Sequence, residues 1–337
     1  MNLFHEDQLA WLTQITVVTL DPEQPIIDPH HHLWRDMMGD VYTITEYQAD
    51  TGSGHNVVGT VYMECGTEYR DQGPEEERSL GETAFVLAQR EQSLAEGAPI
   101  LGMVGHVDLT LGEGAAPLLD QHLQLAGPFF KGIRHAGASA EPGVELVIPG
   151  PAPRDLFADP DFRRGVQLLG QLGLVYETWH YHYQNADYIE LARACPDTVF
   201  VLDHFGTPLG VPPYDTQREA IYQQWCLDMS ELAKCPNVHL KLGGLAMPDN
   251  GWGWHLAERP PTSDEFVAAQ RDWYLHAIDC FGPPRCMFES NFPVDRVSLS
   301  YNVLYNGFKK LVADFSAEER QAMFHDNANA IYALGLG

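Results

Sequence analysis

Short runs of apolar residues recur along the chain, and most of them end in a cluster of polar residues. Eight such runs begin near residues 25, 57, 100, 129, 174, 199, 238 and 286. Within each run apolar residues stand at successive positions, which is typical of parallel strands that are covered on both faces. The pattern therefore predicts eight parallel strands.

Helical segments fill the gaps between these runs. Amphipathic periodicity and capping residues predict helices over residues 75–96, 161–172, 185–194, 216–233, 263–280 and 316–334. Eight strands that alternate with helices predict an α/β fold, a (β/α)8 barrel with long loops at the mouth where the strands end. A doubly wound open sheet is the alternative, but its polar residues would gather at one switch point rather than after nearly every strand.

The domain organisation expected from the sequence is simple. There is no internal repeat, low-complexity tract or obvious linker. We expect residues 1–337 to form one domain, with residues 1–24 as an N-terminal extension.

The most informative run covers residues 26–34, with the sequence IIDPHHHLW. An apolar strand leads directly into an acid and three histidines. Alternate side chains of a strand share a face, so His30 and His32 are expected to point the same way. Since imidazole is the commonest metal ligand, this pair could hold one metal ion or bind one substrate.

The carboxyl ends of all barrel strands meet at one mouth, so the polar residues that follow the runs should form a single site. Those residues are His30, His31, His32, Glu64, His106, Arg134, His135, Glu177, His180, His182, Asp203, His204, Lys241, Glu289, Ser290 and Asn291. Eight of the 15 histidines of the chain are among them. This concentration indicates a histidine-rich active site, in which His135 is a candidate substrate-binding residue.

Arg134 and one long loop are further candidates for substrate binding. The Arg134 guanidinium suits a substrate carboxylate, because the two groups pair bidentately; the alternative is an ion pair inside the mouth. Residues 243–262 form a loop rich in Gly and Pro that contains Trp252 and Trp254. We expect one of these tryptophans to contact the substrate; the alternative is that both pack against the protein surface.

Charge and cysteine usage narrow the class of protein. The net charge is −27, from 47 acidic and 20 basic residues, which argues against binding to nucleic acid or to an anionic membrane. The six cysteines include no CxxC pair, which indicates reduced thiols. The N-terminus lacks the pattern of a signal peptide and no run is long enough for a membrane span. We therefore expect a cytoplasmic protein that acts on a small molecule.

Several motifs in order along the chain carry a resemblance to a known family. They are residues 28–34 (DPHHHLW), 130–135 (FKGIRH), 201–206 (VLDHFG), 241–244 (KLGG), 287–293 (MFESNFP) and 324–332 (FHDNANAIY). The chain resembles the amidohydrolase superfamily in its amidohydrolase-2 branch, which includes 2-pyrone-4,6-dicarboxylate lactonases and related decarboxylases. The resemblance covers almost the whole chain.

The resemblance implies roles for individual histidines. His30 and His32 match the metal-binding pair at the end of the first strand. Either His180 or His182 matches the histidine of the fifth strand. His204 matches the histidine of the sixth strand, which is a metal ligand in some members and an acid–base group in others.

For the cofactor and the assembly, the resemblance implies a divalent metal and a homodimer. Zinc fits a histidine-rich site, and manganese or iron would be favoured if Glu64 or Glu177 also ligates. Activity without metal stays open, because the resembling group includes metal-free lactonases.

The chain departs from the family pattern at Asn291. The superfamily ends its eighth strand with an aspartate that activates water, and the side chain of asparagine cannot take a proton from water. Another group must then be the base, or the chemistry differs. The candidates are Glu289, Asp295, Glu64, Glu177 and His204.

The leading functional hypothesis is a hydrolase that opens a lactone, or another cyclic ester or amide, of a small carboxylated substrate. Three alternatives stay open. The first is a non-oxidative decarboxylase of an unsaturated or aromatic acid. The second is an oxygenase of amidohydrolase fold with two metal ions. The third is a non-catalytic subunit, which the asparagine at position 291 motivates.

Overall fold

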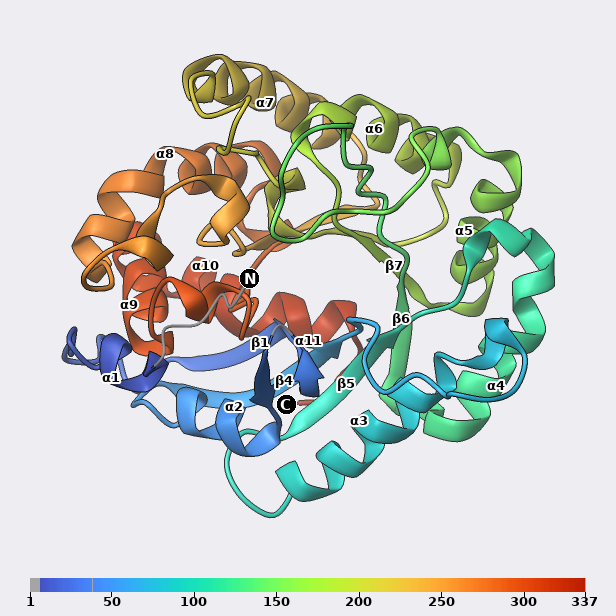
Figure 1. Cartoon of the computed structure of the whole chain (residues 1–337), viewed down its shortest axis with the longest axis horizontal. Helices are drawn as coiled ribbons and strands as arrows, with labels where there is room; N and C mark the ends of the chain where they lie inside the picture. The colour runs from blue at the N-terminus through green and yellow to red at the C-terminus, as the bar shows by residue number, and fades with distance from the viewer. Residues whose placement is uncertain (1–6, 38, 337) are drawn as a thin grey trace.

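The computed structural model describes residues 7–37 and 39–336, and its centre is a sheet of eight parallel strands rolled into a nearly closed barrel (Figure 1). In sheet order the strands are β1 (Pro25–His31), β4 (Asn56–Met63), β5 (Ile100–Gly105), β6 (Phe130–Arg134), β7 (Val175–Thr178), β8 (Phe200–Leu202), β9 (Val238–Leu242) and β10 (Cys286–Phe288). Neighbours in the sheet are also successive along the chain, apart from a small hairpin after β1. The predicted (β/α)8 barrel is therefore confirmed.

The barrel closes where β1 meets the segment that follows β10. His31 and Phe292 form a parallel bridge, and the His32 amide donates to the Phe292 carbonyl oxygen at 2.8 Å. The Asn291 amide donates to the His30 carbonyl oxygen at 3.0 Å. This closure brings the histidines of the first strand beside residues 289–291.

Helices surround the barrel (Figure 1). They are α1 (Gln8–Leu12), α2 (Ile44–Thr51), α3 (Leu80–Ser93), α4 (Ala116–Ala126), α5 (Pro160–Leu172), α6 (Asn185–Ala194), α7 (Arg218–Leu232), α8 (Ser263–Phe281), α9 (Tyr301–Leu311), α10 (Ala317–Gln321) and α11 (Asn327–Ile331). Four predicted helices match α5–α8 closely, and the first, expected over residues 75–96, is the shorter α3. The last predicted helix is divided, because a π-helical turn at Ala322–Asp326 separates α10 from α11.

Four of the described helices and one hairpin were not predicted from the sequence. The missed helices are α1, α2, α4 and α9, and the hairpin pairs β2 (Trp34–Met37) with β3 (Asp40–Tyr42) between the first two barrel strands, where no element is predicted. Of the predicted N-terminal extension, residues 1–6 lie outside the described residues. Among the described helices, none has the length and apolarity needed to cross a membrane.

The interior of the barrel has an apolar layer below a charged layer. Ile27, Val61, Val104, Val175, Val201 and Met287 pack together inside the strands, with Ala328 and Tyr332 from the C-terminal segment. Two positions further along their strands, Val175, Val201 and Met287 are followed by Glu177, Asp203 and Glu289. Because side chains alternate with a period of two, these three carboxylates also point inward, nearer the mouth.

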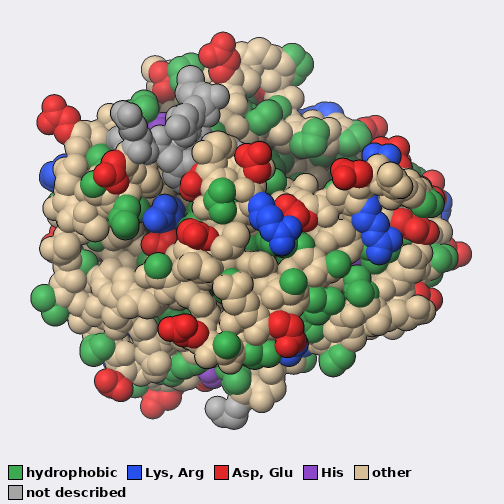
Figure 2. Space-filling view, turned by 60° about the horizontal axis from the view of Figure 1, so that its bottom comes forward, with side chains coloured by type: hydrophobic (Ala, Val, Ile, Leu, Met, Phe, Trp, Pro, Cys, Tyr) green, Lys and Arg blue, Asp and Glu red, His purple; other side chains and the backbone are tan. Residues whose placement is uncertain are grey.

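The surface carries many acidic side chains, and Figure 2 shows them scattered over one face rather than gathered in a patch. This distribution accords with the net charge of −27.

Glu82 links α3 to the end of β4 and should make stability depend on pH. Its buried carboxylate accepts hydrogen bonds from the Tyr62 hydroxyl and the Cys65 amide, both at 2.8 Å. Burial, with a smaller effect of Glu64, raises the pKa of Glu82 from 4.5 to about 8. The folded state therefore holds this proton more tightly than the unfolded state, and the free energy of unfolding should fall as pH rises through this range.

We expect wild-type protein to lose on the order of 3 kcal/mol from this group between pH 5 and 9. Glu82→Gln should be less sensitive to pH by that amount, as measured by urea unfolding at both pH values. Glu91→Gln, on the exposed side of the same helix, is the control. Identical pH dependence in wild type and Glu82→Gln would contradict the prediction.

Candidate active site

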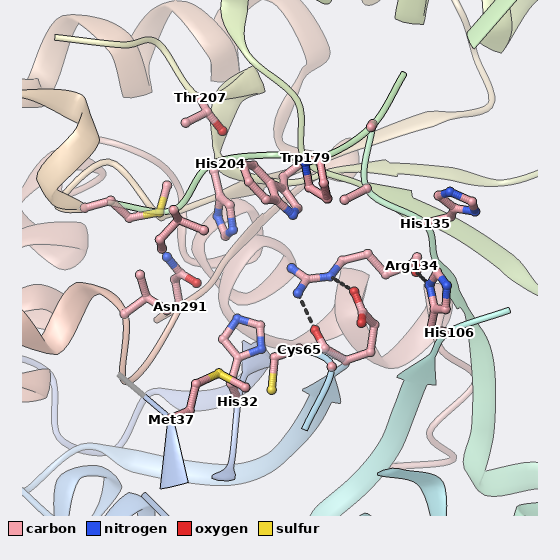
Figure 3. A pocket seen from close by; sticks show the side chains of 18 of the residues that line it. His32, Met37, Cys65, His106, Arg134, His135, Trp179, His204, Thr207 and Asn291 are labelled. Atoms are coloured by element: carbon pink, nitrogen blue, oxygen red, sulfur yellow. Dashed lines mark hydrogen bonds and ion pairs between the residues drawn. The ribbon is translucent and has the colours of Figure 1, made fainter. Parts of the chain in front are cut away.

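A cavity of ≈ 460 Å³ opens at the carboxyl ends of the strands (Figure 3). Residues that follow most of the barrel strands line it, including His32, Glu64, His106, Arg134, Trp179, His204 and Asn291. Seven of the sixteen residues predicted at the strand ends thus line one pocket, although they are far apart along the chain.

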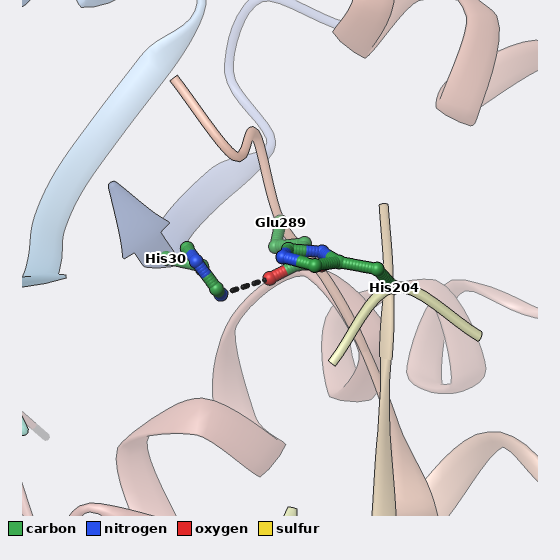
Figure 4. A group of neighbouring side chains, drawn as sticks. All are labelled: His30, His204 and Glu289. Atoms are coloured by element: carbon green, nitrogen blue, oxygen red, sulfur yellow. Dashed lines mark hydrogen bonds and ion pairs between the residues drawn. The ribbon is translucent and has the colours of Figure 1, made fainter. Parts of the chain in front are cut away.

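At the bottom of the cavity, Glu289 lies between two histidines (Figure 4). The His30 Nδ1 atom is 2.7 Å from Glu289 Oε2, and the His204 Nδ1 atom donates to Glu289 Oε1 at 2.8 Å. All three side chains are buried. Burial opposes ionisation of the carboxyl, but His30 and His204 lower the pKa of Glu289 to about 2. Glu289 is therefore an ionised acceptor, and each histidine carries its hydrogen on Nδ1.

The pair His30 and His32 converges as the strand pattern predicts. Their Nε2 atoms are 3.1 Å apart. His32 donates its Nδ1 hydrogen to the Met63 carbonyl oxygen at 2.8 Å, so its Nε2 atom carries a lone pair. His31 points away from this pair, and its ring stacks on Tyr47 at 4.0 Å between centroids.

The backbone conformation sets the direction of the His204 and Asn291 side chains. Both residues adopt left-handed backbone, with φ of 53° and 55°. The KLGG motif makes room for them, since a Cβ atom on Gly244 would lie 2.1 Å from the His204 Nδ1 atom. A Cβ atom on Gly243 would lie 2.4 Å from the Glu289 Cγ atom. These two positions therefore accept only glycine if the site is to keep its geometry.

Beneath the histidines, Lys241 is surrounded by carboxylates. Its ammonium donates to Glu177 and lies 3.3 Å from Asp203 Oδ1 and 3.3 Å from the His30 Nδ1 atom. All four side chains are buried. Burial lowers the pKa of Lys241, but the carboxylates raise it by more, so the lysine stays charged. The sequence places Lys241 and Asp203 at the mouth but assigns them no role. A lysine within an apolar strand is nevertheless a sign that the position is special, because a buried ammonium needs anionic partners.

Arg134 is engaged within the protein. Its Nε atom donates to Glu64 Oε1 at 2.9 Å, and the guanidinium also donates to the Glu64 carbonyl oxygen. Its Nη1 atom is 3.5 Å from His30 Nε2 and 3.7 Å from Asp203 Oδ2. The ion pair foreseen as the alternative role of Arg134 is thus present.

The fit of this cluster to a metal ion follows from its donor atoms. His30, His204 and Glu289 offer ligand atoms that lie within 4.8 Å of one another. The His30 and His32 Nε2 lone pairs face each other, a repulsive contact unless a cation or an additional proton lies between them. The buried oxygens of Asp203 and the Oε2 atom of Glu289 receive no well-aligned hydrogen bond. The donors suit a divalent cation.

Several predicted site residues lie elsewhere. His180 points away from the cavity and pairs with Asn185 Oδ1 at 3.0 Å, whereas His182 accepts from the Leu209 amide at 3.3 Å. Burial lowers the pKa of each of these two histidines to about 4. The structure brings neither to the cluster of His30, His204 and Glu289, because the backbone after β7 turns away into a short 3-10 helix.

The two loop tryptophans do not line the cavity. Trp252 packs under the Arg218 guanidinium, 4.0 Å from the ring centroid, and Trp254 packs on Phe266. This is the surface packing foreseen as their alternative. By contrast, His135 does line the cavity, together with Trp34, Met37, Tyr69 and Tyr181, which the sequence did not single out.

Asn291 is bound to a second acid, Asp295. Its Nδ2 atom donates to Asp295 Oδ1 at 3.0 Å, and the other Asp295 oxygen accepts from the Ala246 amide at 3.2 Å. Burial raises the pKa of Asp295 to about 7. Asn291 lines the cavity, whereas Asp295 lies behind it.

Because the family ends its eighth strand with an aspartate, the resemblance implies that Asn291→Asp is tolerated or gains hydrolysis. The pair with Asp295 adds a cost in stability. Aspartate removes the amide donor and sets two buried carboxyls side by side. We expect Asn291→Asp to lower the free energy of unfolding by about 1–3 kcal/mol at pH 8. Asn291→Asp combined with Asp295→Asn should restore it, because the amide and the carboxyl then exchange places. Equal stability of the single variant and wild type would contradict this expectation.

Comparison with known proteins places the chain in a family. The amidohydrolase family model matches residues 27–334. An uncharacterised protein of Sinorhizobium fredii, y4mH, is 32% identical and the match covers 92% of this chain and 98% of that protein. An L-fucono-1,5-lactonase of Burkholderia multivorans is 28% identical, covering 91% and 96%.

A solved structure agrees in fold. A crystal structure of an amidohydrolase from Burkholderia multivorans with bound Zn superposes with a TM-score of 0.68 at 24% identity, covering 91% of this chain and 99% of that one. The chain therefore belongs to the amidohydrolase family and is an enzyme of the hydrolase type.

Proposed function

We propose that the enzyme hydrolyses a lactone or another cyclic ester or amide. The observation that carries the proposal is the buried group of His30, Glu289 and His204 at the bottom of a cavity into which His204 and Asn291 open. The L-fucono-1,5-lactonase relative supports the lactone as the substrate class, since it matches along almost its whole length.

His204 is the proposed general base. Because the His204 Nδ1 atom donates its hydrogen to Glu289, the Nε2 atom of the ring carries the lone pair. His204 lines the cavity, so this atom can accept a proton from a water molecule that attacks the substrate carbonyl. Glu289 holds the ring in this tautomer and stabilises the imidazolium that forms. The ring then returns the proton to the leaving alkoxide.

Arg134 is the proposed stabiliser of the negative charge that develops on the carbonyl oxygen. It lines the cavity beside His32, and Glu64 fixes its position. A prepositioned guanidinium in a site shielded from water lowers the energy of the oxyanion without reorganisation.

When bound, a divalent ion would be held by His30 and His32, whose Nε2 lone pairs face each other, and it would supply a water molecule of lowered pKa together with Lewis-acid polarisation of the carbonyl. Zinc is the first choice because histidines dominate the donor set. The zinc bound in the Burkholderia multivorans amidohydrolase supports that choice. Manganese or iron is less favoured, because Glu64 and Glu177 are already paired with Arg134 and Lys241.

The dinuclear oxygenase and the non-catalytic subunit receive no support from the site. Among the described residues, a single group of His, Cys, Asp and Glu side chains has ligand atoms close enough to hold a metal. Asn291, which motivated the non-catalytic subunit, lines the cavity together with His204, whose pair with Glu289 can act as a base.

The test is a panel of lactones, cyclic amides and unsaturated or aromatic acids, assayed with the purified enzyme. Opening of a lactone is followed by proton release, opening of a cyclic amide by detection of the amine that forms, and decarboxylation by release of carbon dioxide. We expect ring opening of at least one lactone, with Glu289→Gln reduced at least a hundredfold in kcat/KM. Carbon dioxide release without ring opening would instead support the decarboxylase alternative.

A further inference from the structure

The wall of the cavity opposite Asn291 carries two neighbouring imidazoles, His106 and His135 (Figure 3). Their ring centroids are 5.2 Å apart. Neither residue belongs to the group of His30, Glu289 and His204, and Arg134 lies between the two parts of the cavity in Figure 3. The proposed mechanism uses neither of them.

Main-chain contacts fix the hydrogen positions of this pair. His106 Nδ1 lies 3.0 Å from the Arg134 carbonyl oxygen, which can only accept, so His106 Nε2 carries a lone pair. His135 Nδ1 accepts from the Leu109 amide at 3.2 Å, so the neutral ring carries its hydrogen on Nε2. Burial, with the nearby His106, lowers the pKa of His135 to about 4, which keeps it neutral.

Among the described residues, neither Nε2 atom has a recorded hydrogen-bond partner. The pair therefore presents one acceptor and one donor. A hydroxyl group satisfies both atoms, because it donates to His106 and accepts from His135. A carboxylate can only accept, so it would leave the His106 lone pair opposed to a negative charge.

The charges that line the cavity also disfavour an anion. Arg134 is the one Lys or Arg side chain among the described lining residues, and its guanidinium is engaged by Glu64. Asp249 lines the cavity too, with its oxygens held by the Val147 and Ile148 amides. Glu64, Asp249 and Arg134 together give the lining more negative than positive charge, so a substrate carboxylate would find no unpaired Lys or Arg among the described lining residues.

The remaining wall is suited to a flat apolar body. Trp34, Trp179, Met37, Ile148 and Met247 line it. The Tyr181 hydroxyl, a polar group on the same wall, already donates to the Ile148 carbonyl oxygen at 3.0 Å and accepts from the Gly150 amide at 2.8 Å. A ligand with many hydroxyl groups would find few partners here, whereas a ring would bury its carbon atoms.

We propose that the cavity accepts an uncharged ring compound whose hydroxyl group binds between His106 and His135 while the ring packs against Trp34 and Trp179. This proposal rests on the proposed function, because it names the substrate class of the same site. It also replaces the carboxylated substrate expected from the sequence with a neutral one.

Three small probes without an ester bond test the proposal by calorimetry at pH 7.5. They are 4-methylphenol, 4-methylanisole and 4-hydroxybenzoate, which offer a neutral hydroxyl, an ether that cannot donate, and a hydroxyl with a negative charge. We expect 4-methylphenol to bind about tenfold more tightly than each of the other two.

The matched variants are His106→Phe and His276→Phe, the second on α8 outside the cavity. His106→Phe should bring the ratio of the 4-methylphenol and 4-methylanisole affinities to about one. His276→Phe should leave it at about ten, and thermal unfolding verifies that both variants fold. Equal binding of 4-methylphenol and 4-hydroxybenzoate to wild type, no binding of any probe, or an unchanged ratio in His106→Phe would overturn the proposal.

These binding results are independent of turnover. If the probes bind as expected while no lactone is opened, the proposed function fails and the neutral hydroxyl subsite stands. If lactones are opened while 4-hydroxybenzoate binds as tightly as 4-methylphenol, the function stands and the subsite fails.

Discussion

His204→Asn is expected to lower kcat/KM for the preferred lactone by about 10²–10⁴-fold while the fold is retained, because the imidazole is the proposed proton acceptor. Asparagine is the appropriate replacement, since it tolerates the left-handed backbone that His204 adopts at φ 53°. It also leaves the tight approach of Gly244 undisturbed, being smaller than histidine.

The measurement pairs steady-state kinetics with the thermal unfolding midpoint. His276→Asn is a matched control, because this histidine lies on α8 and its Nε2 atom pairs with the Cys226 carbonyl oxygen at 3.1 Å, outside the cavity. Wild-type kcat/KM in His204→Asn would refute the proposed base. A loss of folding in the same variant would be recognised by its unfolding midpoint.

Lys241→Met is expected to cost about 3–5 kcal/mol of unfolding free energy, the largest effect on stability that the structure suggests. The ammonium lies among Glu177, Asp203 and His30, with no access to solvent. Methionine has a similar length and no charge. Removing the cation therefore leaves buried carboxylates uncompensated, which costs more than the loss of an exposed ion pair.

A second substitution distinguishes this electrostatic effect from altered packing. Lys241→Met combined with Glu177→Gln removes one of the uncompensated buried charges and should recover part of the lost unfolding free energy. Lys234→Met, which removes an exposed lysine paired with Glu231, should change the free energy of unfolding by less than about 1 kcal/mol. Urea denaturation of the three variants checks these values, and a Lys241→Met protein as stable as wild type would contradict them.

The barrel could be predicted because its strands carry the signal in their own sequence. Parallel strands buried on both faces appear as continuous apolar runs, and the polar residues that end them mark the mouth. Helices α4 and α9 were missed because their sequences, APLLDQHLQLA and YNVLYNGFKKL, include Pro, Gly or Asn that also mark turns. Their helical state comes from packing against the barrel, which no local pattern reports. Cytoplasmic location and a homodimer stay predictions.

The candidate site could be predicted where it depends on strand periodicity. His30 and His32 share one face of their strand. Glu289 points into the barrel because it lies two residues after Met287, which also points inward. The positions of His180 and the loop tryptophans depend on the path of the irregular backbone after a strand. Strand periodicity does not determine that path. An ion pair of Arg134 was foreseen as an alternative, but its partner Glu64 could not be named, because the two residues are 70 positions apart in sequence.

The central claim is that the Nε2 atoms of His30 and His32 hold one divalent ion beside the base His204, whose partner is Glu289. Anomalous diffraction from crystals of the purified enzyme, recorded on both sides of the zinc absorption edge, tests it most directly. We predict one peak per chain, in contact with the Nε2 atoms of these two histidines. A peak at another place in the chain, or active crystals that show no peak at this site above or below any divalent-metal edge, would contradict the claim.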